Sequence, residues 1–295
     1  AADLMDGKAI AEAIRAELKS EVDSLRERGV VPGLGVILVG DNPASCSYVT
    51  AKERACESIG IYSDDNRLPA DTSEADLLKR VEAMNQDPQI DGILVQLPLP
   101  KHMDESKILL AIDPAKDVDG FHPMNVGKMM IGEETFFPCT PHGVVQMLMR
   151  SGVETSGKHV VVVGRSNIVG KPVANMLLQK KAGANATVTL CHTGTEDLAG
   201  FTQQADILIV ASGWPNTVTE SMVKPGAVVV DVGVNRVEDA TKKSGYRLVG
   251  DVDFEGVSRV ASKLTPVPGG VGPMTITMLL YNSVESAKAG LMGEG

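Results

Sequence analysis

The stretch from Val160 to Gly170 constrains the fold of this chain more than any other. Its first four residues, Val160–Val163, are β-branched, and such a run is typical of a strand that is buried on both faces of a parallel sheet. A polar turn follows between Gly164 and Gly170, and apolar residues then recur at helical spacing from Val173. This order of strand, glycine turn and helix predicts the start of a nucleotide-binding βαβ unit, in which turn amides and the positive end of the helix face a phosphate.

The turn departs from the G-x-G-x-x-G pattern, because Ser166 stands where the second glycine is expected. Similar turns also occur in α/β proteins without a ligand, but Arg165 favours a ligand, since a guanidinium group binds a phosphate through paired N–H donors. After the next predicted strand, Cys191–Thr195 offers hydroxyls and an imidazole where an NAD site places an acid. Together with Arg165 this favours a 2′-phosphate and hence NADP, although His192 could also be a surface residue at a strand end.

The composition excludes several classes of protein. With 295 residues, of which 43% are hydrophobic and only 3% aromatic, the chain is long enough for two domains with aliphatic cores. A formal net charge of −10 without a basic run argues against nucleic-acid binding. The amphipathic, charged N-terminal segment does not resemble a signal peptide, and no apolar run approaches the length of a membrane span. We therefore expect a cytoplasmic enzyme with no membrane partner.

The four cysteines favour reduced thiols over a metal site. They show neither a C-x-x-C pair nor a histidine at zinc-ligand spacing, so we expect no metal. They are Cys46, Cys56, Cys139 and Cys191.

Hydrophobic periodicity predicts alternating helices and strands in both halves, which is typical of an α/β protein with mainly parallel sheets. The predicted strands are 34–39, 61–68, 90–97, 160–163, 187–190, 207–210, 228–232 and 248–251. The predicted helices are 10–25, 45–59, 73–84, 106–112, 142–149, 173–180, 195–201, 221–223 and 274–289. Six prolines interrupt the pattern between residues 98 and 141, where we expect a long irregular segment with one short helix.

Three groups of polar residues are candidates for chemistry. Tyr48 and Lys52 are four residues apart and so share one face of a predicted helix, where they could transfer protons or simply be exposed. Gln96 ends a predicted strand, and ligands of open α/β sheets bind at the carboxyl ends of strands. Asp117 and Asp119 could lie in a solvated turn or a weak cation site, and Asp119 could instead accept the paired N–H donors of a heterocycle.

Five segments in the same order resemble the bifunctional methylenetetrahydrofolate dehydrogenase/methenyltetrahydrofolate cyclohydrolase family, over about residues 7–289. They are Tyr48-x-x-x-Lys52, 95–100, 116–120, 164–166 and 266–275. The resemblance implies two α/β domains that flank a cleft, the C-terminal one Rossmann-like with a mainly parallel sheet. It implies that residues 1–140 and 274–295 form the folate-binding catalytic domain, that residues 141–273 bind NADP, and that the protein is a homodimer.

The resemblance also implies the roles of individual residues. Lys52 is the expected catalytic lysine, Gln96 assists it, Tyr48 packs on the aromatic rings of folate, and Asp119 binds the pterin. Further residues of the expected folate site are Val95, Leu97, Pro268, Gly269, Gly270, Val271 and Gly272. The expected cofactor-binding residues are Gly164, Arg165, Ser166, Thr193 and Val234, of which Thr193 replaces the usual serine and Val234 the usual isoleucine.

The implied function is the NADP-dependent oxidation of 5,10-methylenetetrahydrofolate to 5,10-methenyltetrahydrofolate, followed by hydrolysis to 10-formyltetrahydrofolate. This one-carbon chemistry serves purine biosynthesis. Three alternatives remain open at this point: a dehydrogenase without the cyclohydrolase, a generic NADP-dependent dehydrogenase, and a non-catalytic folate-binding protein.

Overall fold

Aliphatic runs of the sequence form the strands of two separate parallel sheets. The computed structural model describes residues 1–293. Residues 1–12 and 140–275 form one compact unit, here called unit 1, and residues 13–139 form unit 2 together with the segment that begins at Ile276. Helices α1 (Gly7–Glu27) and α10 (Gly272–Met292) each have residues in both units.

Unit 1 is built on a six-stranded sheet of order β1-β11-β8-β7-β5-β6, in which every neighbouring pair is parallel. The strands are β1 (Asp3–Leu4), β5 (His159–Val163), β6 (Thr187–Cys191), β7 (Ile207–Val210), β8 (Val228–Asp231) and β11 (Lys263–Leu264). The central strands are almost wholly buried, as the valine and isoleucine runs predict. The chain runs from β5 to β6 on one side and then returns to β7 on the other, so the order of strands reverses between β5 and β7.

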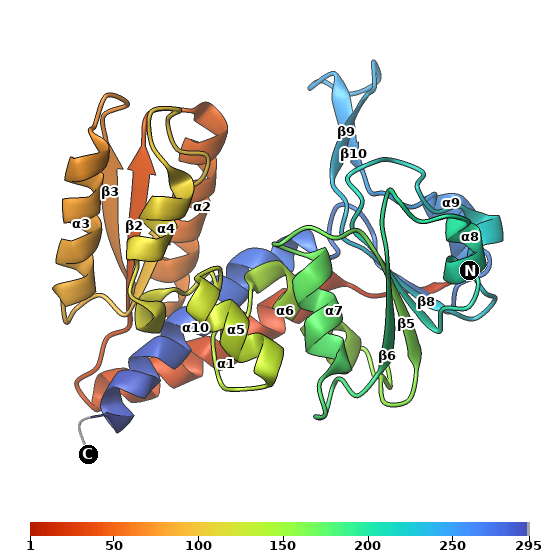
Figure 1. Cartoon of the computed structure of the whole chain (residues 1–295), viewed down its shortest axis with the longest axis horizontal. Helices are drawn as coiled ribbons and strands as arrows, with labels where there is room; N and C mark the ends of the chain where they lie inside the picture. The colour runs from red at the N-terminus through yellow and green to blue at the C-terminus, as the bar shows by residue number, and fades with distance from the viewer. Residues whose placement is uncertain (294–295) are drawn as a thin grey trace. The chain divides into compact units, whose positions relative to one another are not determined.

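The helices of unit 1 are short. They are α6 (Cys139–Arg150), α7 (Gly170–Leu178), α8 (Leu198–Thr202), the 3₁₀ helix η2 (Glu220–Met222) and α9 (Phe254–Ser258). Strands β9 (Asn235–Glu238) and β10 (Tyr246–Val249) form an antiparallel hairpin that projects from the parallel sheet (Figure 1).

Unit 2 contains a three-stranded parallel sheet of order β3-β2-β4. Its strands are β2 (Gly33–Val39), β3 (Tyr62–Leu68) and β4 (Gly92–Val95). Its helices besides α1 and α10 are α2 (Pro43–Ile59), α3 (Glu74–Gln86), α4 (Glu105–Ala111), η1 (Pro114–Lys116) and α5 (Pro123–Ile131). Because the crossovers to β3 and to β4 run in opposite directions, α2 and α3 cover opposite faces of the sheet (Figure 1).

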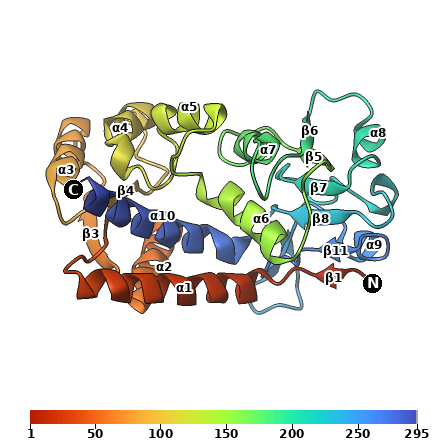
Figure 2. The ribbon, with the colours of Figure 1, turned by 90° about the horizontal axis from the view of Figure 1, so that it is seen from below.

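Helices α1 and α10 run side by side in unit 2 (Figure 2). The Arg15 Nε donates to Thr277 Oγ1 over 2.9 Å, and Lys288 Nζ lies 2.7 Å from Glu21 Oε2. The last helix of the chain is thereby joined to the first.

The fold confirms the predicted α/β class and most predicted elements, with four exceptions described here, and it adds α9, β9 and β11, which were not predicted. The expected strand at 248–251 is instead β10 of the hairpin, which lies outside the parallel sheet. The helix expected from residue 195 begins only at Leu198, because Asp197 adopts a left-handed conformation and its carboxylate accepts from Gly200 N. The strand expected over 90–97 is limited to β4.

Helix α5 is the fourth exception, since it lies in the segment predicted to be irregular with one short helix. Pro123 was interpreted as a break, but it occupies the first turn of α5, where a missing N–H costs nothing. The ring of His122 caps this helix, with Nδ1 accepting from Met124 N at 3.0 Å.

The first twelve residues group with unit 1, whereas the sequence analysis assigned them to the folate-binding domain. The cause is the two-residue strand β1, which pairs with β11. A strand this short has no periodicity that a sequence pattern could reveal. The assignment of one ligand to each domain stays a prediction.

The four cysteines are free thiols. Within residues 1–293, no helix is both long and apolar enough to span a membrane, and no group of three or more His, Cys, Asp or Glu side chains is arranged to hold a metal ion.

Packing around Gly92 yields a prediction about stability. A methyl group added at Gly92 would lie 2.6 Å from Cγ1 of Val118, a fully buried side chain with little room to shift. We expect Gly92→Ala to lower the free energy of unfolding by about 1–3 kcal/mol. Gly127→Ala is the matched control, because its added methyl group meets nothing within 4 Å inside α5 and alanine favours a helix. Urea unfolding of both variants measures the difference, and equal stabilities would refute this account of the packing.

Candidate active site

Helix α2 carries Tyr48 and Lys52 on the face that the spacing predicts. The helix begins at Pro43, and the side chain of Asn42 caps it by accepting from Ser45 N. The ring of Tyr48 is 57% exposed, one turn before the partly buried Lys52. Lys52 Nζ donates a hydrogen bond of 2.8 Å to Gln96 Oε1. Two residues that were predicted separately are therefore in direct contact.

Strand β4 places Gln96 at its carboxyl end. The Gln96 N–H still donates to Ile37 O in the sheet, and the side-chain Nε2 donates to Leu97 O at 3.0 Å. The amide group is thus fixed with its oxygen towards Lys52. Of its neighbours, Val95 has a buried side chain and Leu97 a partly exposed one, so Val95 has only its backbone to offer a ligand.

Asp119 is the residue of this site whose pKa is shifted most by its surroundings. Desolvation by burial raises the pKa of the Asp119 carboxyl to about 7, and the negative charge of Asp117 acts in the same direction, while Lys52 lowers it. A carboxyl group with this pKa exchanges between charged and neutral forms near neutral pH. It is therefore suited to bind a ligand whose N–H donors favour the carboxylate.

The loop that carries Asp119 is built around a second, structural aspartate. Asp117 is buried, and its carboxylate accepts from His122 N at 2.8 Å and from Asn125 Nδ2 at 2.9 Å. These bonds fold the chain tightly after Asp119.

Helix α10 fixes the same loop from the other side. Asn282 Nδ2 donates to Val118 O at 2.8 Å and to Phe137 O at 3.0 Å. One turn later, Ser286 Oγ donates to Asp91 O, immediately before β4. The residues that flank Asp119 and the strand that leads to Gln96 are thereby tied to one helix.

In unit 1, the turn after β5 has the close backbone approach that a dinucleotide site requires. Gly164 has φ +123°, and a Cβ added to it would overlap the carbonyl oxygen of Ala211, which follows β7. Strands β5 and β7 are the two between which the strand order reverses, and ligands of open α/β sheets bind at this point. The residues here fit a nucleotide cofactor.

The side chain of Ser166 accepts hydrogen bonds from the backbone amides that were expected to face a phosphate. Its Oγ accepts from Val169 N at 3.0 Å and from Gly170 N at 3.4 Å, at the start of α7. A phosphate would instead meet the exposed guanidinium group of Arg165. Thr193 is exposed after β6, and the side chain of Val234 is 60% exposed after β8.

The predicted loop of prolines and glycines also lies in unit 1. The peptide bond between Val267 and Pro268 is cis, and Gly269 has a positive φ of +96°. Gly269 O accepts from Gly7 N at 3.0 Å, so the start of α1 holds this loop.

The structure thus divides the predicted residues into two sets. Unit 2 contains the contact between Lys52 and Gln96, with Asp119 close enough to Lys52 for their charges to interact. Unit 1 contains the residues predicted for the cofactor and the loop from Pro268 to Gly272.

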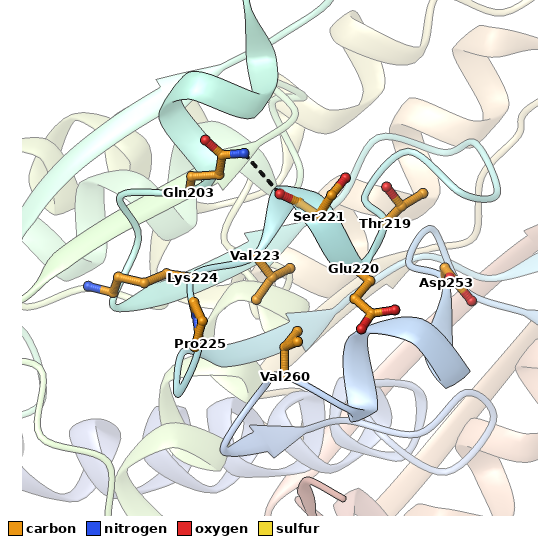
Figure 3. Close-up of a pocket in the computed structure, with 9 residues that line it drawn as sticks. All are labelled: Gln203, Thr219, Glu220, Ser221, Val223, Lys224, Pro225, Asp253 and Val260. Atoms are coloured by element: carbon orange, nitrogen blue, oxygen red, sulfur yellow. Dashed lines mark hydrogen bonds between the residues drawn. The ribbon is translucent and has the colours of Figure 1, made fainter.

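A hollow of about 780 Å³ in unit 1 has none of the predicted residues in its wall (Figure 3). Gln203 Nε2 donates to Ser221 O there, at 2.9 Å. The residues that line the hollow are Gln203, Thr219, Glu220, Ser221, Val223, Lys224, Pro225, Asp253 and Val260.

Comparison with protein families identifies the chain. Residues 5–119 match the catalytic domain of tetrahydrofolate dehydrogenase/cyclohydrolase, and residues 138–291 match the NAD(P)-binding domain of the same enzymes. The chain belongs to the tetrahydrofolate dehydrogenase/cyclohydrolase family. The predicted family and enzyme class are confirmed.

Individual members of the family are similar over nearly their whole length. The bifunctional protein FolD of Syntrophus aciditrophicus is 61% identical over 288 residues, which cover 98% of both chains. The crystal structure of the bifunctional enzyme FolD from Campylobacter jejuni is 50% identical with a TM-score of 0.92, over 98% of this chain and 99% of that one. The dehydrogenase-cyclohydrolase of Trypanosoma brucei, solved with NADP and an inhibitor, is 42% identical with a TM-score of 0.90, over 98% of both chains.

Sequence reasoning missed the residues of this family member that support Asp119. Asn282 and Ser286 are buried polar side chains in a helix whose other buried positions are mostly apolar, such as Leu279 and Leu280. Their spacing of four residues places them on one face. Two polar residues on one face of an otherwise apolar helix can be recognised in the sequence. They indicate a helix whose side chains donate hydrogen bonds to backbone carbonyls.

The raised pKa of Asp119 gives a prediction about pH and stability. A carboxyl whose pKa is 3.8 when unfolded and about 7 when folded destabilises the fold as it ionises, so the cost is absent below pH 3.8 and complete above pH 7. We expect Asp119→Asn to be more stable than the wild type at pH 8, by about 1–4 kcal/mol, with the difference shrinking towards pH 4. Urea unfolding across this range measures it, with Asp71→Asn, an exposed residue, as the control for loss of one charge. A constant difference at all pH values would contradict the assignment.

Proposed function

We propose that this family member oxidises 5,10-methylenetetrahydrofolate with NADP and hydrolyses 5,10-methenyltetrahydrofolate to 10-formyltetrahydrofolate, with Lys52 as the catalytic lysine. The observation that carries the assignment of Lys52 is its hydrogen bond to Gln96. An exposed helix face, which was the alternative for Lys52, would not have an amide oriented towards its amine.

The hydrolysis requires movement of protons. Water adds to the methenyl carbon, the bond from this carbon to N5 breaks, and the carbon becomes the formyl group on N10. Both water protons leave the oxygen, one of them to N5 and the other to solvent. In the proposal, Lys52 Nζ carries a proton between the water and N5, while Gln96 Oε1 holds Nζ in place.

Two other residues of unit 2 bind the folate in this proposal. Asp119 accepts N–H donors of the pterin, and this interaction favours the carboxylate against the desolvation that raises its pKa. The exposed ring of Tyr48 stacks on the aromatic rings of the substrate. The backbone of Val95 and Leu97 and the loop from Pro268 to Gly272 complete the proposed folate-binding residues.

The cofactor is proposed to be NADP, which supplies the oxidant when it is bound. Its shared phosphates are assigned to the turn with Gly164 and Ser166, and its 2′-phosphate to Arg165 and Thr193. Two observations support this assignment. The guanidinium group of Arg165 is exposed, and the turn beside it leaves no room for a side chain at position 164. Val234 offers an apolar contact. The dehydrogenase step itself needs alignment rather than a strong acid or base, because two nitrogens stabilise the product cation.

A homodimer and a cytoplasmic location complete the proposal. The seven-residue strand β3 lies at an edge of its sheet, and such an edge offers backbone N–H and C=O groups to a second copy. Four free thiols support a reducing compartment. A mass of one chain in sedimentation equilibrium would exclude the dimer, and recovery of the enzyme in a secreted fraction would exclude the location.

The role of Lys52 is tested by Lys52→Met, which keeps the length of the side chain but removes the amine. We expect loss of methenyltetrahydrofolate hydrolysis by at least a hundredfold, because positioned proton transfer contributes about 10²–10⁴ in rate. Lys79→Met, an exposed residue on α3, is the matched control. Decay of methenyltetrahydrofolate measured by absorbance decides the outcome, and a variant that hydrolyses at the wild-type rate would remove Lys52 from the mechanism. A wild type without hydrolysis would leave only the dehydrogenase.

The cofactor assignment is tested by Arg165→Ala. Loss of a charge-assisted phosphate contact is expected to raise the KM for NADP by at least tenfold and to change the KM for NAD little, because only NADP carries the 2′-phosphate. Reduction of each dinucleotide with methylenetetrahydrofolate measures both constants. Equal effects on the two would show that Arg165 binds the shared phosphates instead.

A further inference from the structure

Two buried carboxylates lie behind the loops that follow β7 and β8 in unit 1. Asp231 is the last residue of β8 and is 4% exposed, and Asp251 follows β10 and is 0% exposed. Neither residue was singled out by the sequence analysis. Burial of two carboxylates is costly unless their oxygens accept hydrogen bonds. The groups that donate these hydrogen bonds therefore indicate which parts of the fold the two residues hold in place.

Asp231 joins the turn after β8 to the segment around Asp251. Its Oδ1 accepts from Gly233 N at 3.0 Å and from Asp251 N at 2.9 Å, and its Oδ2 accepts from Val252 N at 3.1 Å. A Cβ added at Gly250 would overlap the carboxylate of Asp231, so the two segments are in close contact.

Asp251 in turn joins the loops that follow β7 and β8. Its Oδ2 accepts from Ser212 N at 2.8 Å and from Gly213 N at 2.9 Å. Its Oδ1 accepts from Asn235 Nδ2 at 2.8 Å. One carboxylate therefore sets the separation between residues 212–213 and residues 233–235.

Both loops border the proposed cofactor site. The loop after β7 begins at Ala211, whose carbonyl oxygen lies against Gly164, and the loop after β8 contains Val234. Strands β5, β7 and β8 are neighbours and parallel, so their carboxyl ends meet at one edge of the sheet. A shift of either loop would change the space that is available to a dinucleotide at this edge.

We propose that Asp231 and Asp251 are positioning residues for the dinucleotide, which hold residues 212–213 and 233–235 at the separation that NADP requires. This inference rests on the proposed assignment of Gly164, Arg165 and Val234 to the cofactor. An ion pair would be a weak argument for such a role, but all of these donors except Asn235 Nδ2 are backbone amides, whose positions define the loops themselves.

The test uses the variant Asp251→Asn. An asparagine can still accept from Ser212 N and Gly213 N, but its Nδ2 then faces the Nδ2 of Asn235, and two donors repel each other. We expect the KM for NADP to rise at least tenfold. Hydrolysis of methenyltetrahydrofolate, which consumes no dinucleotide, should stay within twofold of the wild type and so reports an intact fold.

The double variant with Asp251→Asn and Asn235→Asp restores a donor opposite an acceptor between these two side chains, at the loss of the bond of 3.1 Å that Asn235 Nδ2 donates to Gly250 O, so the rescue is partial. It is expected to lower the KM for NADP at least threefold relative to Asp251→Asn, an effect that a residue acting only on stability would not give. Asp253→Asn is the matched control, because Asp253 caps α9 through Gly256 N and an asparagine also caps a helix. Its KM for NADP should equal that of the wild type.

Each remaining outcome overturns the inference. A wild-type KM for NADP in Asp251→Asn would do so, and so would a double variant no better than the single one. If both variants lose the hydrolysis and unfold, the carboxylate is a structural element of unit 1 and the inference fails. An unchanged KM for NADP and for NAD in Arg165→Ala would instead refute the cofactor assignment, which separates the two failures.

Discussion

A carboxylate that is removed from water must find donors, and this constraint shapes the loops of both units. In unit 2, Asp117 is buried and accepts from the backbone of the residues that follow it. In unit 1, Asp231 and Asp251 do the same for three segments that are distant in sequence. In each case the desolvated acid determines the path of a loop, because backbone amides are among the donors that satisfy it.

Asp119 differs from these three residues in what acts on its carboxyl group, because the carboxylates of the other three accept backbone N–H donors. Its environment is set by desolvation and by the opposed charges of Lys52 and Asp117, and its pKa is raised to about 7. Desolvation also raises the pKa of Asp231, to about 6, but there backbone amides act against it, whereas at Asp119 the charge of Lys52 opposes the cost of desolvation. Such a cost is expected where a ligand, rather than the protein, supplies the missing donors. Asn282 and Asp117 hold the loop from both sides.

Much of the fold could be predicted from the sequence because the buried strands are continuous aliphatic runs. The four valines of β5 are the clearest example, and the amphipathic spacing of α1 is another. The exceptions have local causes. Pro123 begins a helix, a position that proline suits, in a segment whose many prolines predict irregular structure, and Asp197 delays the start of α8 by its left-handed conformation. The pairing of β1 with β11 adds the first residues of the chain to the sheet of unit 1, and two residues carry too little pattern to predict it.

The candidate site was less predictable than the fold. Its residues could be identified one by one from the sequence, but the contacts between them could not. The contact between Lys52 and Gln96 depends on α2 packing on the sheet that contains β4, which no spacing along the chain specifies. The supporting residues were harder still, since Asn282 and Asp251 act on backbone atoms far away in sequence. Both are polar side chains in apolar surroundings, and a buried polar group must have a partner. A search for such residues in predicted helices and strand ends would therefore find the supports of a site, even where it could not say which loop each of them holds.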